Sequence, residues 1–350
     1  MTDRDIMRQI NSYIAQRGFS CTEGLTEKYY LSLKSRPFVF LTGRGQTDLT
    51  RLPLLFSEAI GATQANGQVK ILKVRPDWMD SSDLFGWVNL EGKFIPGVII
   101  NFLKTAQKDP EKPYFLILDQ LILSRAEYYL RDVLDSVESR AQETSRPLVT
   151  MAYYGRDEAA AQAYGLIPAL DNLYIIATVN LDDASLPLNQ KLLDRVHALY
   201  LQKDDVTGQA SQAPTPVSAD NSFLCTEYYR LDQCGDYSDA LQEYFAVFTD
   251  LNRILSGATA YVDFTIRNDA ILYLIHNRQS GVLTPEAALD HMIAQKVLTR
   301  VQGSRKAVEP VLLKLLVYCT DRSTPYAYSA EKIRRMLALC ESEGFASFWN

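Results

Sequence analysis

The chain has 350 residues, of which 47% are hydrophobic, and a formal net charge of −6 at pH 7. This length and hydrophobic content suffice for a large buried core and favour two domains over one. The negative net charge argues against a broad basic surface for nucleic acid, and no apolar run approaches the roughly 18 residues of a membrane span.

Cysteine and histidine usage indicates a reducing compartment and gives no support for zinc. The cysteines are odd in number, scattered and without a C-x-x-C pair, which fits a cytoplasmic protein: Cys21, Cys225, Cys234, Cys319 and Cys340. The histidines are isolated from one another in the sequence. We therefore expect neither a zinc site nor a histidine-activated nucleophile.

Helices and strands alternate in the first part of the chain. Two amphipathic helices are predicted at the N-terminus, 5–17 and 26–34. Buried strands are predicted at 38–43, 69–74, 114–119, 173–180 and 198–201. Helical patterns lie between them, from Thr50 and over 96–107, 124–140 and 189–195. This alternation predicts an α/β fold with a mostly parallel sheet, whose carboxyl-terminal strand ends form the binding edge.

The composition changes after the last of these strands. Residues 207–222 are rich in Ala, Ser, Pro and Gln, as in a linker or exposed loop. Every later periodic segment is helical: 237–255, 263–276, 285–298, 307–318 and 329–343. We therefore predict an N-terminal helical extension (1–36), an α/β domain (37–206), the linker (207–222) and an all-α domain (223–350).

The stretch Phe-Val-Phe-Leu-Thr-Gly-Arg-Gly-Gln-Thr-Asp-Leu-Thr, residues 38–50, has the layout of a phosphate-binding loop without its chemistry. A working loop reads G-x-x-x-x-G-K-[ST], in which N–H groups hold phosphate, the Lys reaches the outer phosphates and the hydroxyl binds Mg²⁺. Gly43 and Thr50 keep the first glycine and the hydroxyl, whereas Asp48 and Leu49 replace the second glycine and the lysine. A carboxylate at Asp48 repels phosphate by about 1 kcal/mol in water and about 4 kcal/mol at an effective dielectric of about 20. An ordinary strand-to-helix turn has the same layout.

The order of a strand with this loop, a strand ending in Asp, a strand ending in Asn and a helical domain resembles an AAA+ ring subunit. Several stretches are similar to the GTPase subunit (McrB) of modified-cytosine restriction systems: 74–86, 113–119, 124–129, 178–183, 192–195 and 295–304. The resemblance runs from about residue 29 to residue 349. It implies an α/β AAA+ domain with a helical lid, in a GTP-hydrolysing hexameric ring that recruits a nuclease-associated subunit (McrC). The family also carries an N-terminal DNA-recognition domain, for which the residues before the first strand leave no room, so we expect only indirect contact with DNA.

Matched residue by residue, the resemblance assigns Thr50 and Asp119 to the Mg²⁺ shell and Asn180 to sensing the outermost phosphate. Gln120 stands where the family has the Glu that polarises the attacking water, and an amide does not accept a proton as a carboxylate does. The family's next asparagine falls on Ile122. The general base is therefore absent.

Three arginines and two acids complete the match. Arg195 corresponds to an arginine finger that reaches a neighbouring subunit's site, Arg125 lies on the face between subunits, and Arg267 resembles the second sensor. Asp182 and Asp183 fall in a stretch that resembles the family's guanine-associated motif.

Each assignment has a structural alternative. Asp119 and Asn180 suit capping of the turns that follow their strands. The subunit-face arginine and the second-sensor arginine also suit solvated charges on helix faces. We interpret Trp78 and Trp87 as packing anchors rather than as platforms on which a base stacks.

The losses at the loop lysine and the general base predict a catalytically degenerate subunit, a structural or regulatory member of a homo- or hetero-oligomeric ring in restriction or anti-phage defence. GTP or ATP with Mg²⁺ is expected for the family, weakened here by about 4 kcal/mol or more, which is about a thousandfold. Two other classes stay open. One is an active GTP- or ATP-hydrolysing motor in which Arg44 or Arg51 replaces the lysine, and the other is a nucleic-acid-binding adaptor that keeps only the scaffold.

Overall fold

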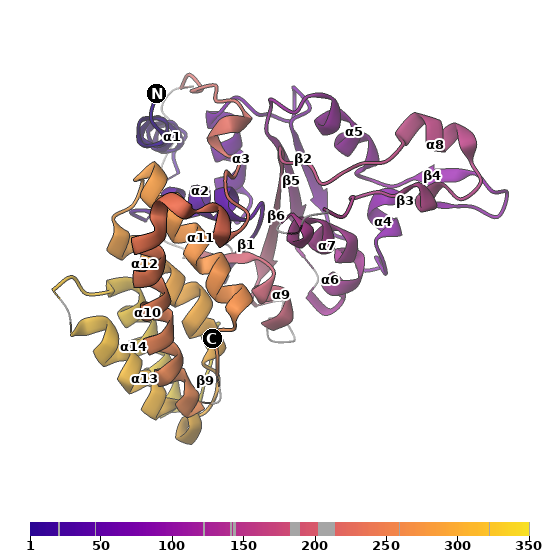
Figure 1. Cartoon of the computed structure of the whole chain (residues 1–350). Helices are drawn as coiled ribbons and strands as arrows, with labels where there is room; N and C mark the ends of the chain where they lie inside the picture. Colours follow the sequence, from indigo (N-terminus) through magenta and orange to yellow (C-terminus); the bar gives the residue numbers. More distant parts are fainter. Residues whose placement is uncertain are drawn as a thin grey trace. The chain divides into compact units, whose positions relative to one another are not determined.

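The computed structural model describes residues 1–19, 22–45, 47–121, 123–140, 142, 145–182, 190–201, 214–258, 260–321 and 323–349, without the side chains of 123–125. It divides into two compact units, Met1–Glu227 and Tyr228–Asn350, which are coloured indigo to salmon and orange to yellow in Figure 1. Within the described ranges, no helix combines the length and the apolar character needed to cross a bilayer.

A five-stranded parallel sheet forms the centre of the first unit. Its strands are β1 (Phe38–Gly43), β2 (Val69–Lys73), β5 (Tyr114–Asp119), β6 (Leu173–Asn180) and β7 (His197–Leu201). They lie in the order β2-β5-β6-β1-β7, and each neighbouring pair is parallel. Each predicted strand is present within one residue of its predicted ends, which confirms the predicted α/β class with a parallel sheet. Buried strands in a parallel sheet are apolar on both faces, so their sequence signal is strong.

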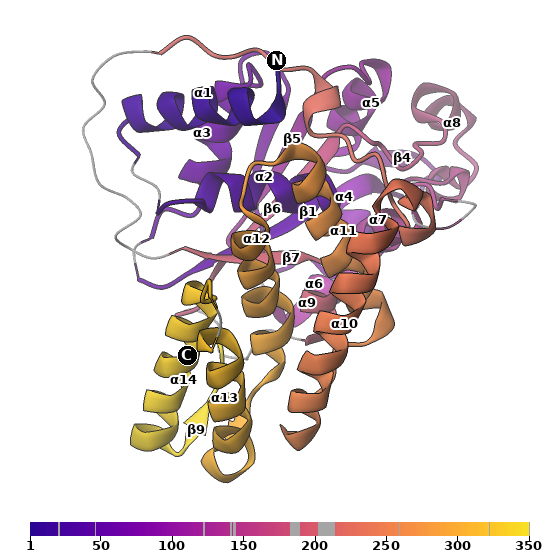
Figure 2. The ribbon, with the colours of Figure 1, turned by 60° about the vertical axis from the view of Figure 1, so that its left-hand side comes forward.

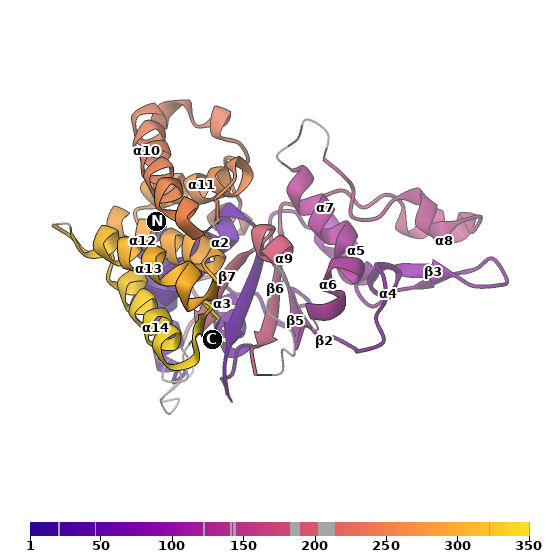
Figure 3. The ribbon, with the colours of Figure 1, turned by 90° about the horizontal axis from the view of Figure 1, so that it is seen from below.

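Helices cover both faces of this sheet. Figure 3 shows α2 (Leu25–Ser35) and α3 (Arg51–Ala59) on one side, and α5 (Ile100–Lys108), α6 (Leu123–Tyr129) and α7 (Arg131–Ser139) on the other. The chain passes from β1 to β2 at one edge of the sheet. The later connections, from β2 to β5, from β5 to β6 and from β6 to β7, run in the opposite direction across the sheet. Right-handed crossovers then place the helices on opposite faces, so a crevice opens at the carboxyl end of β1.

The N-terminal helices belong to the first unit. Helix α1 (Asp3–Gln16) begins with a capping box between Thr2 and Asp5. It packs against α3, as Figure 2 shows. The side chain of Arg17, just after α1, forms an ion pair of 3.0 Å with Glu58 on α3.

Between β2 and β6 the structure differs from the predicted helices. A short helix α4 (Ser82–Phe85) leads into an antiparallel hairpin of β3 (Gly86–Val88) and β4 (Phe94–Pro96). Helix α5 therefore begins at Ile100, after the hairpin, and not at residue 96. The single helix predicted over 124–140 is broken at Leu130, whose φ of −93° and ψ of 2° are not helical. A 3₁₀ turn (Met151–Tyr154) and α8 (Glu158–Tyr164) were not predicted.

The two tryptophans in this region have different environments. Trp78 is buried and packs edge-on against Tyr129, with ring centroids 5.7 Å apart, as a packing anchor does. Trp87 lies on the hairpin and is 52% exposed, so the prediction of a packing anchor is wrong for it. Trp87 is paired with Ile95, which is 40% exposed, on the outer face of the hairpin, whereas Phe94 on the other face is buried against Tyr154 and Tyr164.

The later part of the predicted linker is attached to the first unit. The N–H of Val217 donates to the carbonyl of Ala59 at 2.7 Å, and the N–H of Asn221 donates to the carbonyl of Glu111 at 2.8 Å. Phe223 then stacks on Tyr30, with ring centroids 4.6 Å apart. The second unit begins at Tyr228, five residues after the predicted boundary.

The second unit is mainly helical: α10 (Ser238–Leu255), α11 (Phe264–Ser280), α12 (Pro285–Met292), a π-helical turn (Ile293–Val297), a 3₁₀ turn (Leu298–Arg300), α13 (Arg305–Thr320) and α14 (Ala327–Glu343). Local sequence fixes several ends, since Asp263 caps the start of α11 and Gly281 ends it in the left-handed conformation. The prediction of an all-α domain is wrong in one detail. A short antiparallel pair joins β8 (Gly303–Ser304) to β9 (Phe345–Ala346), and strands of two residues show no periodicity.

Candidate functional site

A pocket of about 320 Å³ lies at the carboxyl ends of β1, β5 and β6. Among the described residues, its lining includes Gly43, Gly45, Thr47, Asp48, Leu49, Thr50, Asp119, Gln120, Thr178 and Asn180. The structure thus brings together the predicted site residues of the first unit from the loop and the strand ends. Sheet register explains the convergence, since Gly43 at the end of β1 is level with Asn180 at the end of β6.

The described part of the lining is rich in oxygen atoms and has no positive side chain. Among the described residues that line the pocket, none is a lysine or an arginine. Two are carboxylates, Asp48 and Asp119. Such a lining suits neutral or cationic groups better than phosphate, because like charges repel at short range.

Leu49, at the position of the expected lysine, is turned inward and is only 7% exposed. A Cβ atom added to Gly43 would lie 2.9 Å from Cδ2 of Leu49 and 3.2 Å from the carbonyl oxygen of Leu201. The first distance is shorter than real Cβ contacts, and the second is tighter than most of them. A larger residue at position 43 would therefore displace the Leu49 side chain and press on the backbone of β7, so the packing here favours glycine whether or not a phosphate binds.

Asp48 binds the start of α3. Its Oδ1 atom accepts hydrogen bonds from the backbone N–H of Thr50 at 3.2 Å and from the Thr50 hydroxyl at 2.8 Å. A carboxylate is favourable at this point because the first N–H groups of a helix lack partners and carry partial positive charge. The predicted Mg²⁺ ligand Thr50 is therefore already hydrogen-bonded to a carboxylate of its own loop.

Thr178 connects the ends of β5 and β6, a role that no sequence motif indicates. Its hydroxyl donates to Oδ1 of Asp119 at 2.8 Å and accepts from the N–H of Gln120 at 2.9 Å. Gln120 has a φ of +57°, in the left-handed region that costs a residue with a side chain about 1–2 kcal/mol. The hydroxyl contact and the bond from the N–H of Leu121 to the carbonyl of Thr178, at 2.8 Å, hold this strained backbone in place.

The segment after β6 contacts the loop after β1. Asn180 accepts a hydrogen bond from the N–H of Asp182 at 3.0 Å, and a carboxylate oxygen of Asp182 accepts one from the N–H of Gly45. Ile122 and Asp183 lie outside the described residues, and so does the side chain of Arg125.

The two arginines near the loop do not take the place of the missing lysine. Arg51 donates through Nη2 to the carbonyls of Arg17 and Gly18, at 3.2 and 3.1 Å. Its guanidinium also lies over the ring of Phe19, 5.6 Å from the centroid. Arg44 is exposed and does not line the pocket.

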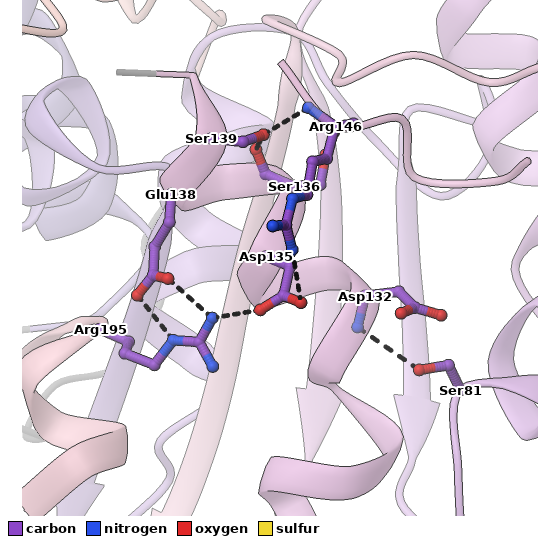
Figure 4. Close-up of polar contacts among 8 residues, drawn as sticks. All are labelled: Ser81, Asp132, Asp135, Ser136, Glu138, Ser139, Arg146 and Arg195. Carbon is purple, nitrogen blue, oxygen red and sulfur yellow. Dashed lines mark hydrogen bonds and ion pairs between the residues drawn. The ribbon is translucent and has the colours of Figure 1, made fainter. Parts of the chain in front are cut away.

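Arg195 is paired within its own chain (Figure 4). It follows helix α9 (Gln190–Asp194), and its Nε and Nη2 atoms donate to Glu138 at 2.6 and 2.8 Å. Nη2 also donates to Asp135 at 2.6 Å. Burial alone would lower the pKa of Arg195, but the bonds to Glu138 and Asp135 outweigh it and raise that pKa above its usual range. The sequence predicted a side chain that projects toward a neighbour, whereas here it joins α7 to the start of β7.

Arg267 lies in the first turn of α11 in the second unit. Its guanidinium stands over the ring of Phe245 on α10, 4.6 Å from the centroid, and Nη2 donates to Oδ1 of Asn268 at 3.2 Å. Within this unit Arg267 therefore joins two helices.

Comparison with known proteins bears mainly on the second unit. A family model described as a domain of unknown function (DUF8727) matches residues 216–345. The search of curated proteins gave no match. The chemistry of the pocket in the first unit is therefore argued from its own residues.

The Arg195 pair predicts a difference between two arginines that share Asp135. The side chain of Arg195 is 24% exposed and makes three short bonds, whereas that of Arg146 is 65% exposed and is 3.3 Å from Asp135. We expect Arg195→Ala to lower the free energy of unfolding by about 2 kcal/mol and Arg146→Ala to change it by less than about 0.5 kcal/mol. Urea denaturation of both variants measures this. Equal losses would contradict a structural role specific to Arg195.

Proposed function

We propose that this chain is a catalytically degenerate AAA+ subunit of the McrB-like type, a structural or regulatory member of a nucleotide-driven ring in restriction or anti-phage defence. One observation carries the proposal. The pocket at the carboxyl edge of the sheet gathers the loop and strand-end residues that the resemblance assigns to a nucleotide site, and Leu49 and Gln120 stand where the family has a lysine and a glutamate. We interpret the second, helical unit as the lid of such a subunit.

The pocket chemistry supports weak or absent nucleotide binding. Among the described lining residues, an outer phosphate would meet the carboxylate of Asp48 and no cation. Thr50 and Asp119 offer oxygen ligands of the kind that Mg²⁺ prefers, but Mg²⁺ at such sites is usually held by one or two carboxylates together with the phosphates. Metal binding therefore depends on a nucleotide that the pocket does not favour, and we assign this chain no hydrolytic step.

The two other classes gain no support from the site. A motor with a substitute cation needs Arg44 or Arg51 at the phosphates, and Arg51 is bound to carbonyls at the end of α1. A nucleic-acid adaptor needs a basic surface, and the net charge of the chain is −6.

The first test restores the loop. We expect Asp48→Gly with Leu49→Lys to recover binding of GTP or ATP with Mg²⁺, because loop length and Thr50 are retained. A ligand at a hundred times its Kd stabilises a protein by about 2.7 kcal/mol, so thermal unfolding with and without nucleotide reports binding. Asp48→Gly with Leu49→Met is the matched control without the new charge. If the lysine variant folds and gains no more than this control, the loop is not a former nucleotide site.

A ring role assigns Arg195 a second position. In an assembly its guanidinium would leave Glu138 and Asp135 and stabilise the charge that develops at a neighbour's phosphate. Such in-trans arginines change rates by about 10³ to 10⁵ in other systems. The ion pair in the single chain would then be the resting position of the side chain.

The second test uses a mixed complex with the active subunit that purifies together with this chain. We expect Arg195→Ala to slow hydrolysis by the complex, whereas Glu138→Gln, which loosens the pair but keeps the arginine, leaves it equal or faster. A purely structural Arg195 predicts that both variants act in the same direction, in proportion to lost stability. That result, or the absence of an active subunit in the purified complex, would contradict the finger.

A further inference from the structure

The loop after β1 is bound by a carboxylate from another strand end. The N–H of Gly45 donates to a carboxylate oxygen of Asp182, which is 137 residues further along the chain. In a phosphate loop, backbone N–H groups at this place bind the nucleotide's phosphates. A carboxylate is the protein group closest to phosphate in charge and in hydrogen-bond acceptance.

The position of Asp182 is fixed by the sheet. The N–H of Leu181 donates to the carbonyl of Gly43 at 2.9 Å, which extends the ladder between β1 and β6 by one bond. The N–H of Asp182 then donates to Oδ1 of Asn180 at 3.0 Å. The chain after β6 is thereby held close to the loop, and Asp182 reaches Gly45.

Packing contributes little at Gly45. It has a φ of +67°, and a Cβ atom placed there would meet no heavy atom within 4 Å. The bond to Asp182 is one restraint on this exposed part of the loop, and the bond of 2.7 Å from the Thr47 hydroxyl to the carbonyl of Arg44 is another. At the other end of the loop, Asp48 binds the N–H and hydroxyl of Thr50 in the same way.

We propose that Asp182 is an internal anion that occupies the phosphate position of the loop and keeps the loop closed without nucleotide. This inference rests on the proposed function, because it concerns the same loop. Phosphate and Asp182 then compete for the N–H of Gly45. The competing assignment is that Asp182 recognises a guanine base, as the resemblance of its stretch implies.

The test adds Asp182→Ala or Asp182→Asn to the Asp48→Gly, Leu49→Lys variant and measures calorimetric binding of tripolyphosphate and of GTP, each with Mg²⁺. Tripolyphosphate has no base, so it reports the loop alone. We expect Asp182→Ala and Asp182→Asn each to lower the Kd of both ligands by about tenfold, because that is the scale of one charge-assisted hydrogen bond. Glu91→Ala, which removes one exposed charge from the hairpin, is the matched control and should change binding by less than about twofold. Unchanged tripolyphosphate binding with weaker GTP binding would overturn the internal anion and favour base recognition.

A second measurement is independent of any recovered binding. In the otherwise unaltered chain, Asp182→Ala should speed hydrogen exchange of the Gly45 amide by about tenfold, and Glu91→Ala should leave it unchanged. Exchange that does not respond to Asp182→Ala would overturn the proposal. The Asp48→Gly, Leu49→Lys variant could bind no ligand while Asp182→Ala still speeds exchange at Gly45. That result would contradict a former nucleotide site in the loop but would support the hydrogen bond between Asp182 and Gly45.

Discussion

The site depends on one constraint: the backbone N–H groups that follow β1 need hydrogen-bond acceptors. A strand that turns into a helix leaves N–H groups without partners, and phosphate loops give them to a nucleotide. Here carboxylates of the same chain accept these bonds, Asp48 from Thr50 and Asp182 from Gly45. Leu49 adds apolar packing over Gly43. The loop therefore has hydrogen-bond acceptors from its own chain at both ends. These bonds explain how the loop keeps its conformation although it has no lysine to hold a phosphate.

The sheet was predictable from the sequence because β1, β5 and β6 are buried along nearly their whole length and are mainly apolar. The edge strand β2 is only partly buried and includes two lysines, but it keeps a short apolar stretch. Register then brings strand ends to one edge, so the convergence of Gly43, Asp119 and Asn180 follows from three local patterns. The hairpin at 86–96 was missed because its strands are three residues long and Trp87 is exposed. The break at Leu130 was missed because the helical spacing of apolar residues continues through it.

The contacts that give the site its chemistry could not be read from local sequence. Arg195 meets Glu138 and Asp135 across 57 and 60 residues, and Asp182 meets Gly45 across 137. The local sequence does not distinguish Thr178 from the other residues of β6, although its hydroxyl is bonded to both Asp119 and Gln120. The sequence alone does not show which residue pairs with a charged side chain. The family resemblance therefore assigns Arg195 to the site of a neighbouring subunit, whereas in the structure it is bound to Glu138 and Asp135 of its own chain.

Nucleotide binding by the unaltered chain tests the central claim most directly. Equilibrium dialysis with GTP and with ATP, each with Mg²⁺, is combined with a turnover assay on the same preparation. The account predicts no saturable binding up to about 1 mM and no turnover above that of an Asp119→Ala variant. Micromolar binding with hydrolysis that Asp119→Ala abolishes would contradict it, because a pocket whose described lining holds no cation would then be a working NTPase site.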